Sequence, residues 1–394
     1  MTTVDYIPFI TTEYDCRAAS QLYSDAFAMR VGLELIDDIR SKLPSGPKRW
    51  VDASIDGLHY KDLSKLSDKY RKHLNKFVGY QQIADPQFQK NPDKNVAEQF
   101  VFSVLDCCNL ESPDWVSIPQ LPLTADASRN KINRLFADLT AEWKVKDGFR
   151  GKLILPVIFT NQTQINKKTE RNKKIVSISA CLSAARADGI WVVDSTLNDQ
   201  EGSGKFDERF PALRKFHEEL NEKIPQNTVT ICGPYWGMNI VLWARGCVHF
   251  PAIGLGGSYK YNIPGQKLHK GIIRLALRPL RRWAIGSPSL KGWLSETVAG
   301  LAPGDPVRAD FAIIEKDFAK LQIAPNGKLQ IAAFYKSWFN KFSALSQAGR
   351  ALALYQDLSS SYVLGKSLKT LPDKREGTAR RPERVAQQLM LNCL

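Results

Sequence analysis

The sequence predicts a closed (β/α)8 barrel of the TIM type, followed by a basic, all-helical C-terminal extension. Eight short apolar runs, each followed by a helix-like stretch, fill the first two-thirds of the 394-residue chain. The runs are continuous rather than alternating, as expected of parallel strands that helices cover. An open doubly wound sheet is the competing fold. Eight units within about 260 residues, and the absence of GxGxxG after the first strand, favour closure.

The strands are expected, in chain order, at residues 6–10, 50–55, 78–83, 115–121, 152–159, 189–194 and 228–233, with the eighth beginning at Val248. Helices are expected between them at residues 17–42, 63–77, 96–108, 127–143, 175–187, 208–224 and 238–245. The longest is predicted because apolar residues recur at helical spacing, as Leu22, Ala26, Met29, Leu33, Ile36 and Ile39 do. Residues 1–264 therefore form the predicted barrel.

Residues 265–394 show a different pattern, and only helices are expected there. Apolar spacing predicts helices over 267–283, 310–321 and 331–358, and Pro279 should kink or end the first. A turn is expected at 325–327. The stretch 366–384 is basic and poor in apolar residues, which predicts a mobile or partner-ordered segment.

The positive charge of the chain is concentrated in this extension. Residues 1–264 carry 34 Lys and Arg against 31 Asp and Glu, whereas residues 265–394 carry 21 against 9. The asymmetry predicts an anionic partner for the extension, with nucleic acid (DNA or RNA) first and an acidic protein or a membrane surface as the runner-up. A solvated surface that only aids solubility is the alternative.

Five basic residues of the predicted helix 267–283 are expected to grip a phosphate backbone. They are Lys270, Arg274, Arg278, Arg281 and Arg282. Alternatively, the apolar stripe of this helix docks onto the barrel or a partner chain, and the charges are merely solvated.

The carboxyl ends of the strands supply the site in a closed barrel, whatever the reaction. Asp52, Ser54 and Asp56 alternate onto one face at the end of the second predicted strand. Asp194 ends the sixth strand. Asp194 and Asp52 would serve as general base, nucleophile or magnesium ligands. The alternative for Asp194 is structural: it caps the next turn or pairs with an arginine of the barrel.

Three further strand-end residues complete the set of candidates. Asp85, after the third predicted strand, is a third catalytic candidate. Gln120 and Asn161, after the fourth and fifth, are expected to bind the ligand.

Glycine-rich turns follow the last two strands: Gly233-Pro234-Tyr235-Trp236-Gly237 and Gly254-Leu255-Gly256-Gly257-Ser258. The second turn resembles the strand-8 turn of phosphate-binding (β/α)8 barrels, where backbone N–H groups and a hydroxyl hold an anion. The resemblance implies a ligand with a phosphate group, held by Gly233, Gly254, Gly256, Gly257 and Ser258. Tyr235 and Trp236 would stack on a base or sugar ring. Alternatively, the glycines only relieve crowding at the barrel rim.

Several classes of protein are disfavoured. The chain has no Walker A, HExxH or GxSxG motif, and its five histidines lack metal-ligand spacing, so no zinc site is expected. The seven cysteines include no CxxC and are expected to be mostly buried, reduced thiols of a cytoplasmic protein. No apolar stretch approaches the roughly 20 residues that span a bilayer, and no secretory signal opens the chain, so no membrane location is expected.

The leading hypothesis is a cytoplasmic barrel that recognises nucleic acid or a nucleotide and acts on a phosphate-bearing base or sugar. A second hypothesis is a non-catalytic scaffold or recognition subunit of a multiprotein, nucleic-acid-targeting assembly. A third is a phosphosugar enzyme whose basic tail builds an oligomer interface. An enzyme of the first kind would use an aspartate as general base or nucleophile, with Mg²⁺ as the one cofactor suggested.

Overall fold

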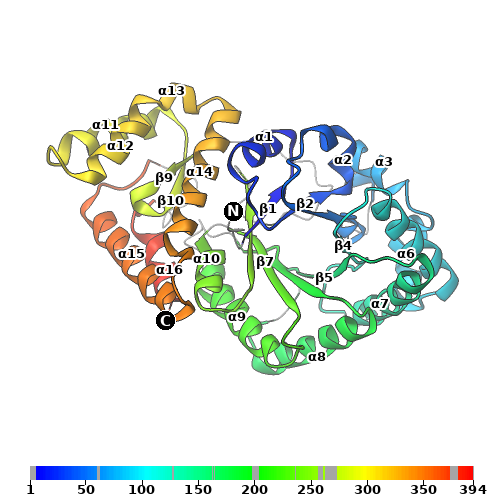
Figure 1. Ribbon diagram of the computed structural model, residues 1–394. Helices are drawn as coiled ribbons and strands as arrows, with labels where there is room; N and C mark the ends of the chain where they lie inside the picture. Colours follow the sequence, from blue (N-terminus) through cyan, green and yellow to red (C-terminus); the bar gives the residue numbers. More distant parts are fainter. Residues whose placement is uncertain are drawn as a thin grey trace.

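The computed structural model describes residues 6–59, 63–126, 128–161, 163, 165–197, 204–235, 237–255, 261, 273–372 and 380–393. Eight parallel strands close into a barrel in chain order, which confirms the predicted fold class (Figure 1). The strands are β1 Ile7–Ile10, β2 Ala28–Gly32, β3 Lys48–Asp52, β4 Trp115–Ser117, β5 Lys152–Phe159, β6 Gly189–Asp194, β7 Val229–Tyr235 and β8 Phe250–Gly254. Pairing of β1 with β8 completes the circle.

Two predicted elements in the first half of the barrel are wrong. One strand was missed and another was predicted where a helix lies, so the expected number of strands is still correct. The helix expected over 17–42 is interrupted by β2, which is buried along its whole length and therefore shows no alternation. The strand expected over 78–83 is instead the short helix α4, Tyr80–Ala84. Gly79, at a φ of +77°, turns the chain into α4.

Helices cover the outside of the barrel (Figure 1). Those between the strands are α1 Glu13–Leu22, α2 Leu33–Ile39, α3 Asp68–Leu74, α4, α5 Pro86–Lys90, α6 Lys94–Asn109, α7 Ser128–Asp147, α8 Lys168–Ala184, α9 Gly204–Asn221 and α10 Gly237–Ala244. Of the connections between consecutive strands of the barrel, the one between β3 and β4 is the longest, because it contains α3, α4, α5 and α6.

Large aromatic side chains fill the barrel. Phe9 of β1, Trp50 of β3 and Trp191 of β6 meet at its centre, with ring centroids 5.4–5.6 Å apart. Trp115 of β4 and Phe250 of β8 meet with centroids 6.4 Å apart. Each of these side chains comes from a different strand, and together they make the barrel interior a packed core rather than a pore.

The region after the barrel is mostly helical, as predicted, but its first described segment is a hairpin. Strand β9, Arg274–Leu277, pairs antiparallel with β10, Arg282–Ile285, where a helix over 267–283 was expected. Pro279 lies in the 3-10 turn between the two strands, and it blocks a continuous helix there. The helices that follow are α11 Pro288–Gly300, α12 Pro306–Lys316, α13 Phe318–Leu321, α14 Ala324–Ser343, α15 Gln347–Ser367 and α16 Arg384–Met390.

The C-terminal helices complete the outer layer of the barrel between α10 and α1 (Figure 1). The ring of Phe339 in α14 packs on Tyr6 before β1 and on Trp243 of α10, at 4.9 Å and 4.2 Å. The hydroxyl of Tyr23 donates to the main-chain oxygen of Ala332, 2.6 Å away. α14, α15 and α16 therefore share one apolar core with the barrel. The hairpin and α11–α13 enclose a second, smaller core.

Part of the positive charge of the C-terminal region is neutralised inside the molecule. Lys328 pairs with the buried Asp15 at 2.7 Å, and Lys336 pairs with Asp25 at 2.8 Å. Arg384 of α16 pairs with Asp207 of α9 at 2.7 Å. These pairs join the basic region to acidic residues of the barrel.

All seven cysteines are free thiols, six buried and Cys107 half-buried. Within the described ranges, no helix combines the length and hydropathy needed to cross a membrane.

Candidate active site at the carboxyl end of the barrel

An ion pair lies inside the barrel, above the aromatic layer. Arg30 of β2 and Asp52 of β3 point inward and are paired through Nη2 and Oδ2, and both side chains are buried. The same Nη2 atom donates to Ser54 Oγ at 3.2 Å. The guanidinium lies 5.0 Å from the ring centre of Phe9 and 5.8 Å from that of Trp191. Aromatic faces and a carboxylate therefore keep this guanidinium charged.

A second carboxyl group lies beside this pair. Asp56 opens the short 3-10 helix Asp56–His59 after β3 and is 4% exposed. Its Oδ2 accepts a hydrogen bond from the hydroxyl of Tyr261, whose ring packs edge-on against Trp191 at 5.4 Å. Burial and then the negative charge of Asp52 raise the pKa of Asp56 to about 8. At neutral pH Asp56 is therefore mostly a protonated carboxylic acid.

Side chains of α3 hold the loop after β3, which carries Ser54 and Asp56, through hydrogen bonds to its main chain. Ser54 adopts a φ of +53°, and the hydroxyl of Tyr70 donates to its main-chain oxygen. The same hydroxyl accepts from the N–H of Gly57 at 3.1 Å. A Cβ at Gly57 would lie 2.3 Å from the ring of Tyr70, so glycine is required there. The Nε2 atom of His73 is 2.8 Å from the oxygen of Ala53.

Glu34, at the start of α2, adds a third carboxyl group. Its side chain folds back over Gly32, the last residue of β2, and one carboxyl oxygen is buried without a hydrogen-bond partner. Its negative charge contributes to the raised pKa of Asp56. The site thus combines three carboxyl groups with one guanidinium, and this excess of acid favours a bound proton.

Asp194 lies at the carboxyl end of β6 but faces away from this site. Trp191 points into the barrel, so Asp194, three residues later, points to the helix layer. Its Oδ2 pairs with Arg209 of α9 at 2.6 Å, and its Oδ1 accepts from the N–H and hydroxyl of Thr196 at 2.9 and 2.6 Å. Burial raises the pKa of Asp194, and Arg209 opposes this shift. Its contacts are those of the structural alternative, and its carboxylate lies on the opposite side of the sheet from Asp52.

The other strand-end candidates are dispersed. Asp85 does not follow a strand, because 78–83 is not one. It is exposed and caps α5 by accepting from the N–H of Gln87 at 2.7 Å. Gln120 donates to the main-chain oxygen of Asn133 in α7 at 3.0 Å. Asn161 is exposed in the turn after β5.

The two glycine turns are described only in part. Gly233 has a φ of +108°, and a Cβ there would lie 2.5 Å from the oxygen of Ala252, so only glycine fits. Tyr235 is fully buried, and its hydroxyl bonds the main chain of Asp194, so its ring has no open face for a base. Gly254 is buried at the end of β8. Trp236, Gly256, Gly257 and Ser258 lie outside the described residues.

The arginines expected to bind nucleic acid are placed by the hairpin, not by a helix. Arg282 is 2% exposed and donates to main-chain oxygens, and Arg274 lies over the ring of Trp283 at 4.6 Å. Arg278 is half-buried in the 3-10 turn between the strands. Lys270 lies outside the described residues.

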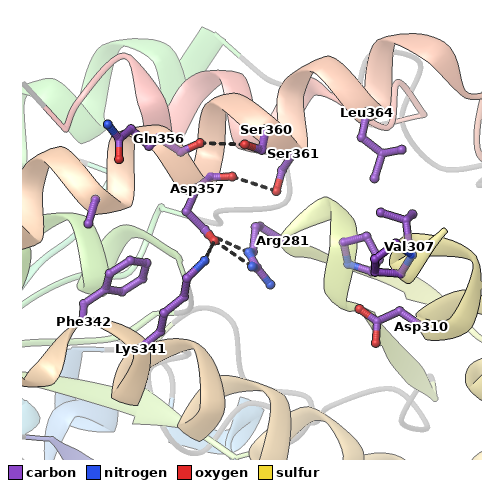
Figure 2. Close-up of a pocket in the computed structure, with 13 residues that line it drawn as sticks. Arg281, Val307, Asp310, Lys341, Phe342, Gln356, Asp357, Ser360, Ser361 and Leu364 are labelled. Atoms are coloured by element: carbon purple, nitrogen blue, oxygen red, sulfur yellow. Dashed lines mark hydrogen bonds and ion pairs between the residues drawn. The ribbon is translucent and has the colours of Figure 1, made fainter. Parts of the chain in front are cut away.

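Arg281 belongs to a partly buried charge cluster in the C-terminal region. It makes two hydrogen bonds to Asp357 of α15 at 2.7 and 2.8 Å, and Lys341 binds the same carboxylate at 2.5 Å (Figure 2). A cavity of about 530 Å³ lies beside this cluster. Its walls include Pro279, Val307, Phe342 and Leu364. Since Asp357 already takes both cations, this cluster fastens the hairpin to α14 and α15.

The residues that sequence reasoning missed are Arg30, Glu34, Tyr261 and Arg209. Arg30 was hidden inside the predicted helix 17–42. An arginine within an apolar run was the signal for a strand with an inward charge. Tyr261 follows β8 and reaches Asp56, whose strand lies several positions away around the barrel, and no local pattern marks that contact. Among the described residues, no group of three His, Cys, Asp or Glu side chains is arranged to hold a metal ion.

No protein-family model and no curated protein sequence matches the chain. Among solved structures, it is similar to a variant carboxyl transferase domain of pyruvate carboxylase from Rhizobium etli with pyruvate, at 10% identity and a TM-score of 0.38, covering 99% of this chain and 61% of that one. It is also similar to the enoyl reductase domain of MlnA from the macrolactin biosynthesis cluster of Bacillus amyloliquefaciens, at 10% identity and a TM-score of 0.30, covering 99% of this chain and 94% of that one. The chain thus spans about three-fifths of the first of these chains. At these scores neither likeness assigns a family or an activity, and the fold assignment rests on the strand topology.

Proposed function

We propose that the protein is an enzyme that performs acid–base chemistry at the carboxyl end of its barrel, with Asp56 as the group that gives and takes the proton. The substrate class is a nucleotide or a phosphorylated sugar. Nucleic-acid association and action on a phosphate-bearing base or sugar both belong to this proposal.

The observation that carries the proposal is the environment of Asp56. A general acid works best when its pKa lies near the working pH, and burial beside Asp52 brings the pKa of Asp56 to about 8. Strongly perturbed carboxyl groups cluster at functional sites, and active sites of (β/α)8 barrels lie at this end of the fold. Tyr261 holds the Asp56 carboxyl group in place through its hydroxyl.

The Arg30–Asp52 pair orients the groups around the proton donor. Asp52 supplies the negative charge that keeps Asp56 protonated. Arg30 in turn holds Asp52 and Ser54, whose hydroxyl lies 3.2 Å from the guanidinium. A carboxylic acid beside an ionised carboxylate is the arrangement that separates acid and base roles on one fold.

The test is a substrate screen that compares the wild type with Asp56→Asn. A mixture of nucleotides and phosphorylated sugars is incubated with each protein, and mass spectrometry follows which compounds are consumed. We expect turnover by the wild type and a loss of about 10²-fold or more in the variant, the contribution typical of a positioned acid. Asp38→Asn, which removes an exposed carboxylate that pairs with Lys69, is the control and keeps full activity. Equal turnover by the wild type and Asp56→Asn overturns the proposal.

A further inference from the structure

Arg129 is a buried arginine with no ion pair among the described residues. It is the second residue of α7, at the carboxyl end of the barrel, and it is 5% exposed. Nη2 donates to the side-chain oxygen of Gln89 at 3.1 Å, whereas Nη1 is buried with no hydrogen-bond partner. Within the described ranges, no carboxylate lies at ion-pair distance from it. The nearby carboxylate of Asp126 instead accepts from the N–H of Ser128 at 2.8 Å.

Lys174 of α8 is a second such cation, at the same end of the barrel. It is 9% exposed, and its Nζ contacts the main-chain oxygen of Thr124 at 3.3 Å. Thr124 belongs to the short segment between β4 and Arg129, so both cations border this segment. No ion pair of Lys174 is present in the part of the chain that the structure describes. Burial lowers the pKa of both Arg129 and Lys174 below their ordinary values.

Other buried arginines of the barrel are paired. Arg171 of α8 is as buried as Arg129, yet it binds Glu219 of α9 at 2.7 and 3.0 Å and donates to two main-chain oxygens. Arg30 pairs with Asp52, and Arg209 pairs with Asp194. An unpaired buried charge is costly, so it is retained where a ligand supplies the missing partner.

We propose that Arg129 and Lys174 form a binding site for a phosphate group of the substrate. This inference rests on the proposed function: the phosphate belongs to the substrate whose proton Asp56 gives or takes. His59 ends the 3-10 turn that Asp56 begins, and burial together with the positive charge of Arg129 lowers its pKa to about 4. The positive charge of Arg129 therefore acts on the 3-10 turn that Asp56 begins.

Exposed lysines lie on the first turns of the same two helices. Lys131 lies on the first turn of α7, and Lys167 and Lys168 lie at the start of α8, and none of the three forms an ion pair within the described residues. Their charge would draw phosphates toward Arg129. Both a free nucleotide and a nucleic-acid strand carry the required group.

The first experiment titrates inorganic phosphate into the full chain and follows binding by calorimetry. We expect saturable binding by the wild type, at least 10-fold weaker binding by Arg129→Gln and by Lys174→Gln, and unchanged binding by Arg134→Gln. Arg134 is the matched control, since it lies on the same helix but is exposed and paired with Asp138. Wild-type affinity in both site variants, or no binding by the wild type, overturns the proposal.

The second experiment measures thermal stability without phosphate. A phosphate site predicts that Arg129→Gln unfolds at or above the wild-type temperature, because it removes an unpaired charge. A structural arginine predicts a loss like that of Arg171→Gln, and this result contradicts the proposal. Failure of Arg129→Gln to fold would also assign Arg129 a structural role. The phosphate affinity of Lys174→Gln, measured by calorimetry, would then decide whether the site binds phosphate.

Two further ligands distinguish the sources of the phosphate. A nucleic-acid strand predicts that a short single-stranded oligonucleotide binds at least 10-fold more tightly than a nucleoside 5′-monophosphate and loses affinity as salt rises. A nucleotide substrate predicts equal affinities. Asp56→Asn should bind phosphate normally, so failure of the phosphate site and failure of Asp56 as proton donor give different results.

Discussion

Asp56 differs from an ordinary surface aspartate because its folded environment favours the neutral form. The unfolded chain releases this proton near pH 3.8, whereas burial beside Asp52 raises the folded pKa to about 8. Between these values the folded state binds the extra proton, so the free energy of unfolding falls as the pH rises through this window, by at most about 1.4 kcal/mol per pH unit.

Asp56→Asn should remove this dependence. The variant carries no ionisable group at position 56, so its stability should gain on that of the wild type between about pH 5 and pH 8. Urea unfolding at several pH values in this range measures the difference. Asp38→Asn should follow the wild-type profile throughout, and parallel profiles for Asp56→Asn would show that Asp56 ionises normally.

Asp194 has a structural role in this account: its ion pair with Arg209 stabilises the fold. Asp194→Asn leaves the guanidinium of Arg209, 11% exposed, without its ion-pair partner, and breaking such a buried pair costs about 3–5 kcal/mol. The double variant Asp194→Asn, Arg209→Met should recover part of the loss. Asp138→Asn, at an exposed pair, should cost less than about 0.5 kcal/mol. Chemical denaturation compares the four proteins, and a stable Asp194→Asn that has lost turnover would instead assign Asp194 a catalytic role.

How far the sequence predicts the site depends on whether a contact is local. Asp52 and Asp56 follow a recognisable strand, and their spacing places them on one face. Arg30 was not predicted as a site residue, because its strand is buried on both faces and its apolar residues continue the spacing of the helix that follows. Tyr261 was not predicted as a site residue either, because its contact with Asp56 forms only when the barrel closes, and no local sequence pattern indicates that contact.

At the scale of elements, the second half of the barrel follows its sequence pattern closely. β5, β6 and β8 begin within two residues of the expected positions, because long apolar runs alternate with amphipathic helices. The hairpin β9–β10 was mistaken for a helix, since its apolar residues on two short strands imitate helical spacing around Pro279. α16 was not expected at all, because its sequence neighbours are basic.

α16 nevertheless contributes to the core. Leu389 is fully buried and packs against Gly237 at the start of α10, where an added Cβ would meet its side chain at 2.3 Å. Leu389→Ala should lower the free energy of unfolding by about 2–5 kcal/mol, the cost of a cavity. Leu391→Ala, at a position that is 69% exposed, should change it by less than about 0.5 kcal/mol. Equal unfolding midpoints for these two variants in urea would mean that α16 is not docked in solution.

At the scale of the whole molecule, the C-terminal helices are part of the barrel wall. α14 packs on α1 and α15 packs on α10, and Lys328 and Lys336 hold α14 to acidic residues of the barrel. A chain of residues 1–264 should therefore lack a cooperative thermal transition, because the apolar faces of α1 and α10 that pack on α14 and α15 would be open to water. Circular dichroism during heating provides the test. A cooperative transition at the full-length midpoint would show that the barrel folds without these helices.

The most direct test of the account is the protonation state of Asp56. Protein labelled with ¹³C at the aspartate carboxyl carbon is titrated by NMR, with Asp56→Asn used to assign the signal. The account predicts one aspartate that titrates near pH 8 in the wild type, with its signal absent from the variant. Titration of every aspartate below about pH 5, the range of unperturbed carboxyl groups, would contradict it.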